Sequence, residues 1–317
     1  MDIILFDKVC IYDADKNKTI LYGQYRTRFN KIHVEGQECP VFFNNSQPDF
    51  YIKLTGKVTT IDTLRISYAK DEKILSNITL TFPFEDCDLA LTPSSAIIST
   101  LCKQYGHRLD EWIQYNLKLG FSGIVVFDND ANTANALNES TIGEASLTTN
   151  EVCNKYKGRV LCVQFPYAPF SGKHWNTVQR ISLHIGVNAF RKRCRNIALI
   201  DADEFIYLPK NPSMSIETFL SNYNTVTMRS NILTNKNKDD VLDNNILQLA
   251  VYVGRDLYTK TILHTQKIVP NEFLMSPHTH RTQTVLKKTD IIHYHCWMND
   301  RCKWDATMPQ IDFLKPP

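Results

Sequence analysis

The chain has 317 residues, enough for one large or two ordinary domains, and 43% of them are hydrophobic, which suits a chain with a full core. The net charge of +3 is too small to indicate a nucleic-acid-binding protein. The nine cysteines are scattered and form no CxxC pair, which is typical of a reduced protein. The sequence has no signal-peptide pattern, and no apolar run approaches the roughly 20 residues that a membrane span needs. We therefore expect a protein that is cytoplasmic or peripheral to a membrane.

Residues 1–92 have the pattern of β-strands. The segments KIHVEG (31–36), DFYIKLTG (49–56), TLRISYA (63–69) and SNITLTF (76–82) alternate apolar and polar residues between turn signals. No long helical pattern interrupts them. We therefore predict a small N-terminal all-β domain over residues 1–92, with an accessory role and no catalytic residues.

The pattern changes near residue 93, where strands begin to alternate with helices. Asp110 is placed to cap a helix that ends at Gly120, and an apolar periodicity predicts a second helix over residues 174–193. Buried strands are expected around residues 123–130, 158–167 and 197–205. Residues 93–317 are thus predicted to form one α/β domain, an open sheet flanked by helices.

Two of these strands end in carboxylates. If the strand continues through the motif, Asp201 and Asp203 lie on one face and Glu204 points away from them. The two carboxylates then repel each other, and a Mg²⁺ or Mn²⁺ ion between them would remove this repulsion. A solvated strand end is the alternative. Asp128 and Asp130 end another strand, where they could hold a ribose or a base, or could serve as a turn or helix cap. Because ligands bind outside the carboxyl ends of such strands, all four acids are expected on one rim.

Further candidates lie downstream. The pairs His278/His280 and His293/His295 could supply a third, neutral ligand to the cation; packed or surface histidines, or a zinc site with nearby cysteines, are the alternatives. Lys260 could stabilise a departing diphosphate, or could be an ordinary surface base. The chain contains no Walker loop, GxGxxG, GxSxG or HExxH motif, which argues against the enzyme classes that use them.

Taken together, these segments resemble metal-dependent glycosyltransferases of the GT-A fold, in particular family 92 and related family 2-like groups. The residues that carry the resemblance are DEWIQYNLKLGFSGIVVFDND (110–130), Gln179 and IALIDADEFIYLP (197–209), with weaker matches in VTMRSNIL (226–233) and TKTILH (259–264). The resemblance implies a GT-A-like open mixed sheet, a UDP- or GDP-linked sugar donor and a Mn²⁺ or Mg²⁺ ion. Lys103 and Asn116 stand where the family usually has other residues.

The resemblance also implies roles for individual residues. The implied metal ligands are Asp201, Asp203 and a downstream histidine, His280 first, with His278, His293 and His295 as alternatives. The expected donor-binding residues are Lys103, Asp128, Asp130, Gln179, Asp201 and Lys260.

The expected reaction is transfer of the sugar to a hydroxyl of a glycan or glycoprotein acceptor, with neither nucleic acid nor a transmembrane segment involved. An inverting reaction needs a general base, for which the sequence offers Glu272, Asp243 and Asp240 without choosing among them; a retaining reaction does not. The alternatives are a metal-dependent nucleotidyltransferase or sugar-nucleotide hydrolase, and a non-catalytic carbohydrate-binding protein that uses residues 1–92.

Overall fold

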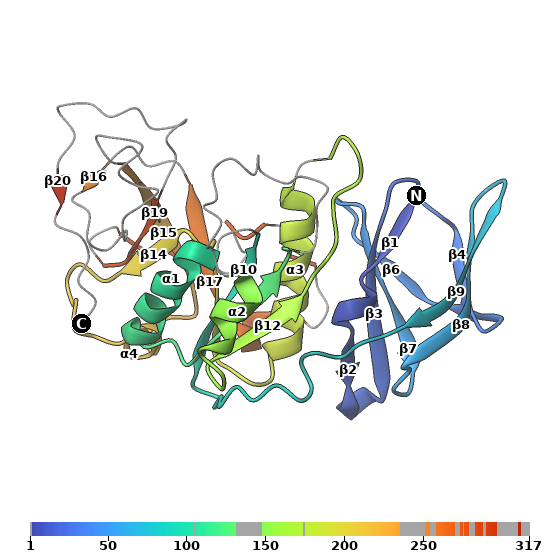
Figure 1. The fold of residues 1–317 in the computed structure, drawn as a ribbon, viewed down its shortest axis with the longest axis horizontal. Coiled ribbons are helices and arrows are strands. Elements are labelled where there is room, and N and C mark those ends of the chain that lie inside the picture. The colour runs from blue at the N-terminus through green and yellow to red at the C-terminus, as the bar shows by residue number, and fades with distance from the viewer. Residues whose placement is uncertain are drawn as a thin grey trace.

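The protein is described here by a computed structural model, in which an N-terminal β region adjoins a mixed α/β region (Figure 1). The structure describes residues 2–103, 106–130, 148–173, 175–234, 251–253, 258–269, 273–274, 276–278, 283–287, 290–296 and 310–311. Within these ranges no helix is both long and apolar enough to cross a membrane.

The N-terminal region contains two antiparallel sheets, as its alternating segments predict. One sheet is formed by β1 (Ile3–Leu5), β2 (Ile11–Asp13), β3 (Lys18–Tyr25), β6 (Val41–Phe43) and β7 (Asp49–Thr55). The other is formed by β4 (Lys31–Val34), β5 (Gln37–Cys39), β8 (Thr60–Ser67) and β9 (Glu72–Thr79). Side chains such as Leu21, Ile32, Phe50 and Leu64 fill a common core between them, so the region is a small sandwich.

The mixed region is built on a larger sheet. Its first four strands run parallel in the order β12 (Val160–Gln164), β11 (Gly123–Asp128), β10 (Ala96–Cys102) and β13 (Asn196–Leu199). β17 (Thr259–His264) pairs antiparallel with β13, and β15 (Thr225–Thr234) pairs antiparallel with β17. The remaining strands are β14 (Glu204–Tyr207), β16 (Val251–Val253), β18 (Gln283–Val285), β19 (Ile292–Cys296) and β20 (Gln310–Ile311). The sheet is therefore open and mixed, as expected.

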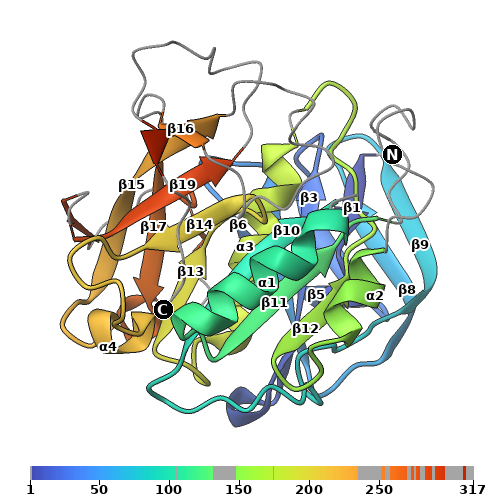
Figure 2. The same cartoon turned by 60° about the vertical axis from the view of Figure 1, so that its left-hand side comes forward.

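Helices cover both faces of the parallel strands, which explains why β10 and β13 are buried along their whole length. α1 (Gly106–Leu119) shares one core with Ile98, Ile124 and Ala198, whereas α3 (Asn176–Phe190) shares the opposite core with Ile97 and Leu199 (Figure 2). The shorter helices are α2 (Thr149–Asn154) and α4 (Ile216–Leu220).

The expected start of the first helix is wrong. Asp110 lies inside α1 rather than at its cap, because the helix begins at Gly106. The Asp110 carboxylate instead accepts a hydrogen bond of 2.7 Å from the Tyr156 hydroxyl. The helix ends as predicted, at Gly120, where a φ of +102° favours glycine.

The chain path through the parallel strands creates a switch point. From β10 the chain moves outward to β11 and β12, and α3 then carries it back to β13 on the other side of β10. The carboxyl ends of β10 and β13 consequently flank a point at which the direction of winding reverses. Crevices at such points are where open α/β sheets bind their ligands, so the residues that follow these two strands define the candidate site.

The β sandwich is joined to the α3 face by a continuous core. Phe6 stacks on Phe165 with ring centroids 5.5 Å apart, and Tyr22 meets His184 of α3 edge-on at 5.4 Å. Asp49 of β7 forms a 2.6 Å ion pair with Arg180 of α3, and only 1% and 10% of the two side chains are exposed. The N-terminal region is thus packed against the helix that leads to the candidate site.

Candidate functional site

The acidic motif after β13 forms a tight turn. β13 ends at Leu199, Ala202 and Asp203 lie in the turn, and β14 begins at Glu204. The Glu204 amide donates to the Asp201 carbonyl at 3.0 Å, and the Asp201 amide donates to Glu204 Oε2 at 2.9 Å. The expectation that Glu204 points away from Asp201 is therefore wrong, because the strand ends before the motif and its alternation does not continue through the turn.

Asp201 is held from two sides. Gln179 Nε2 of α3 donates to Asp201 Oδ1 at 2.6 Å, and Lys260 Nζ of β17 lies 2.7 Å from Asp201 Oδ2. The same ammonium lies 3.1 Å from Glu204 Oε2. Gln179, predicted to bind a donor, thus fixes the first aspartate of the motif.

Lys260 is neither a surface base nor a side chain that projects into solvent. It is 3% exposed, and its partner Glu204 is 1% exposed. Burial alone would lower the Lys260 pKa, but the Asp201 and Glu204 carboxylates outweigh burial and raise that pKa above its ordinary value. Lys260 is consequently a permanent buried cation at neutral pH.

Sequence reasoning missed the role of Glu204. Trp112 Nε1 and the Tyr115 hydroxyl, both of α1, donate at 2.7 Å to the carbonyls of Glu204 and Ile206. The fully buried His293 of β19 lies with its Nδ1 3.6 Å from Glu204 Oε1. An acid at the head of an apolar strand was the available signal, since buried acids nearly always have partners.

The acids after β11 are engaged in local structure. The Asp130 amide donates to Asp128 Oδ1 at 2.9 Å, and the Thr149 amide at the start of α2 donates to Asp130 Oδ2 at 2.9 Å. Asn129 Nδ2 donates to the carbonyls of Phe165 and Tyr167. Burial raises the Asp128 pKa, and the hydrogen bond from the Asp130 amide partly offsets this rise. These contacts match the turn-and-cap alternative; contact of either aspartate with a donor stays a prediction.

Lys103 follows β10 and reaches the start of α3. Its Nζ lies 5.1 Å from the centroid of the Trp175 ring and is buried, without a hydrogen-bond partner in the part of the chain that the structure describes. Burial lowers the Lys103 pKa, and attraction to Asp130 opposes this change. The switch point thus carries a cation near a helix N-terminus, an arrangement that favours an anion.

The described histidines among the predicted ligands are engaged by groups of the chain itself. His278 Nδ1 bonds to the Thr259 carbonyl at 2.5 Å, which requires Nδ1 to carry the proton and leaves Nε2 of the neutral ring as the acceptor. The backbone of His295 pairs with that of Glu204. Among the described residues no three His, Cys, Asp or Glu side chains gather closely enough to hold a metal ion. The predicted His280, Asp240, Asp243 and Glu272 lie outside the described residues.

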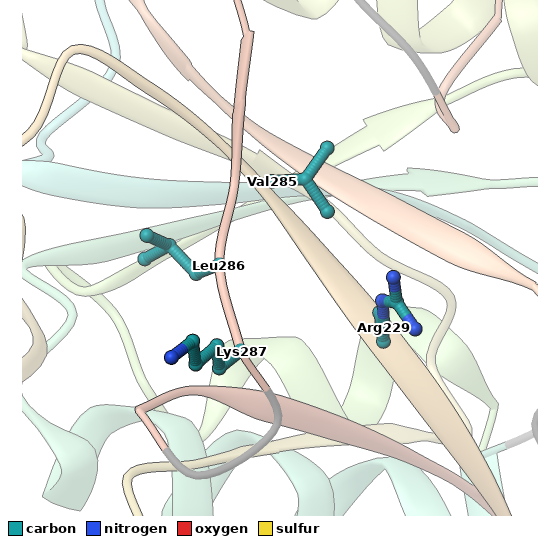
Figure 3. A pocket seen from close by; sticks show the side chains of 4 residues that line it. All are labelled: Arg229, Val285, Leu286 and Lys287. Carbon is teal, nitrogen blue, oxygen red and sulfur yellow. The ribbon is translucent and has the colours of Figure 1, made fainter.

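A pocket of about 270 Å³ lies farther along the sheet, lined by Arg229 of β15 and by Val285, Leu286 and Lys287. Figure 3 shows the Arg229 and Lys287 side chains pointing in different directions. The two cations therefore do not converge on a single anion.

Comparisons with known proteins leave the family open. No family model and no curated protein sequence matches the chain. The fold is similar to a crystal structure of residues 1–349 of the S. aureus glycosyltransferase TarS, with a TM-score of 0.35 and 13% identity. The match covers 64% of this chain and 60% of that one, so the chain spans less than two thirds of the TarS structure. A likeness at this level carries no argument about activity.

Proposed function

We propose that the chain is a metal-dependent glycosyltransferase that moves a sugar from a UDP- or GDP-linked donor to a hydroxyl of a glycan acceptor. One observation carries the proposal: the Asp201–Asp203 turn, with its buried Lys260, lies at the switch point of a doubly wound sheet. Such points bind nucleotides, and a carboxylate turn there is suited to a phosphate-bridging cation.

The proposed ion is Mn²⁺ or Mg²⁺, because the acidic turn carries oxygen ligands of the kind that these ions prefer. Asp201 and Asp203 are the proposed oxygen ligands, and His278, whose Nδ1 is held by the Thr259 carbonyl as in many metal-ligating histidines, is one candidate for the third ligand. His280, His293 and His295 remain alternatives for the third ligand. When bound, the ion supplies Lewis-acid stabilisation of the leaving diphosphate.

The chain's own residues divide the other tasks. We assign Lys103 to the donor diphosphate, because its ammonium lies at the end of β10 without a hydrogen-bond partner among the described residues. We assign Lys260 no direct contact with the diphosphate, because its ammonium is paired with the Asp201 and Glu204 carboxylates. Gln179 orients Asp201. If the reaction inverts the configuration at the sugar, the candidates for the general base that deprotonates the acceptor hydroxyl are Asp240, Asp243 and Glu272.

The first experiment is a thermal-shift panel of UDP, GDP, CMP and UDP-sugars, each with and without Mn²⁺. A ligand that binds only the folded chain raises the Tm by mass action, by an amount equivalent to about 2.7 kcal/mol at 100 times its Kd. We expect a Mn²⁺-dependent shift with one nucleotide, lost in the double variant Asp201→Ala/Asp203→Ala. No shift with any nucleotide contradicts the proposal.

Product analysis distinguishes a glycosyltransferase from the two alternative enzyme activities. A nucleotidyltransferase would release pyrophosphate, and a hydrolase would release free sugar or sugar phosphate when no acceptor is present. The carbohydrate-binding alternative predicts glycan binding without any nucleotide dependence.

A further inference from the structure

Two cysteines of the mixed region, Cys153 and Cys162, are in contact with each other, and the proposed reaction uses neither of them. Cys153 lies in α2 and Cys162 lies in β12, and both are reduced thiols. We propose that the pair is a reversible modification site, which a small peroxide oxidises to a disulfide between α2 and β12. This modification requires neither a sugar donor nor a metal ion, so it is independent of the proposed function.

The two thiols already face each other. They lie within hydrogen-bonding distance, and this contact with Cys162, followed by burial, raises the pKa of Cys153. Both side chains pack in the core beneath α1 and α2. Because the sulfur atoms are in contact, closing the gap to the roughly 2.05 Å of an S–S bond requires rotation of the side chains rather than a rearrangement of the two elements.

The chain between the two cysteines is a compact turn that keeps them together. The Tyr156 amide donates to the Cys153 carbonyl at 3.0 Å, and the Val160 amide donates to the Tyr156 carbonyl at 2.9 Å. Gly158 adopts a φ of +82°, which glycine reaches without strain. The start of α2 is fixed as well, by the Thr148 capping box. The thiols are thus preorganised, and reaction between them needs no separate encounter.

Cys162 is the thiol that an oxidant reaches first. It is partly exposed, whereas Cys153 is 1% exposed and Cys102, a third cysteine of this core, is 2% exposed. The Cys162 thiol donates to Asp128 Oδ2 at 3.9 Å, so a carboxylate beside it can accept its proton. A partly exposed thiol next to a second, buried thiol is the arrangement of an oxidation site with a resolving cysteine.

The reaction has two balanced steps. The Cys162 sulfur attacks the O–O bond of the peroxide, and with hydrogen peroxide this gives a sulfenic acid and one water. The Cys153 sulfur then bonds to the Cys162 sulfur, and the sulfenic hydroxyl leaves with the Cys153 proton as a second water. The two thiols lose two electrons, which reduce the peroxide. Because the Cys162 sulfur no longer carries a proton, Asp128 Oδ2 also loses a donor at the rim of the candidate site.

Peptide mapping of the whole oxidised chain tests the proposal. Trypsin cleaves after Lys155 and Arg159 and so places the two cysteines on separate peptides, 119–155 and 160–173, each with a single cysteine. The folded chain is treated with hydrogen peroxide, and the remaining thiols are alkylated. We expect these two peptides to be joined, at a mass about 2 Da below their sum, in at least about 10 times the yield of any other linked pair. Dithiothreitol should separate them.

The order of the two steps is tested with dimedone, which traps sulfenic acids. Cys153→Ala should accumulate the sulfenic acid at Cys162, whereas Cys162→Ser should give no dimedone adduct at Cys153. Should Cys153→Ala not fold, brief trapping in the unaltered chain identifies the same cysteine. Cys39→Ser, which removes a partly exposed thiol of β5, is the matched control and should leave the yield of the linked peptides within about 2-fold.

Three results overturn the proposal. The first is a folded chain whose Cys162 is converted to sulfinic acid without any linked peptide. The second is a disulfide from Cys153 to Cys102 in place of Cys162. The third is a linked pair whose dimedone adduct forms at Cys153, which would reverse the assigned order.

Discussion

Two Asp-x-Asp motifs follow two parallel strands of the same sheet, β11 and β13, and their carboxylates have different partners. After β11, Asp128 and Asp130 accept hydrogen bonds from backbone amides, and Asn129 donates to two carbonyls. After β13, Asp201 faces a buried ammonium and a glutamine amide. The first cluster is organised by the neutral backbone and the second by charge. A short motif therefore acquires its role from the groups that fold against it.

The largest expected effect belongs to the second cluster. Asp203→Ala should reduce transfer on the order of 10³-fold, because the leaving diphosphate loses the charge stabilisation that a bound cation supplies. The measurement is the transfer rate at saturating Mn²⁺, with an unchanged Tm as the control for folding. Substantial residual activity would remove Asp203 from the metal assignment.

Asn129 tests whether the first cluster is structural. Asn129→Ala removes two hydrogen bonds and leaves the carbonyls of Phe165 and Tyr167 without this donor, so we expect a loss of roughly 2–4 kcal/mol in the free energy of unfolding. Urea denaturation measures the loss. Asn222→Ala, at an exposed turn after α4, is the matched control and should change stability by less than about 0.5 kcal/mol.

Asp130 sharpens the same comparison. Asp130→Ala deletes the acceptor for the Thr149 amide in the first turn of α2 but leaves the Thr148 cap in place, so it should cost about 1 kcal/mol, as the loss of a single hydrogen bond does. Transfer should stay within about 3-fold of the unaltered rate. A donor KM raised more than 10-fold at unchanged stability would instead make Asp130 a donor ligand.

The smallest expected effect is a pH dependence at Asp128. Burial raises the pKa of this carboxyl in the folded chain, so the folded state holds the proton more tightly than the unfolded chain does. The resulting stability is present below the ordinary Asp pKa of about 3.9 and is lost as pH rises through the raised folded pKa. Asp128→Asn keeps the Oδ1 acceptor but cannot ionise. As pH rises through this window, its stability relative to that of the unaltered chain should therefore increase. Unfolding free energies measured from about pH 3 to pH 7 check the sign.

The sequence was most informative where one physical signal dominated. Apolar runs located β11, β12 and β13, period-two alternation located β4, β7 and β8 of the sandwich, and the apolar periodicity of residues 174–193 located α3. The rim that follows the parallel strands was predictable from the same reading, because the carboxyl ends of parallel strands meet at one edge.

The partners within the site were not predictable, since they depend on turns and on pairs distant in sequence. Glu204 folds back because β13 ends at Leu199, and no local pattern places Lys260 beside Asp201. The start of α1 was missed for a similar reason: Asp110 resembles a cap but is used by Tyr156.

The buried Asp49–Arg180 ion pair has a consequence for how the molecule comes apart. It links β7 to the residue next to Gln179, and its burial means that neither partner can be solvated until the sandwich and α3 separate. Separation of the sandwich from α3 would break this ion pair and expose the apolar core around it, so partial unfolding along this interface is disfavoured. Amide hydrogens of β7 and of α3 should therefore exchange with solvent at a common rate, through a single shared opening, although the two elements lie in regions that fold classification would cut apart.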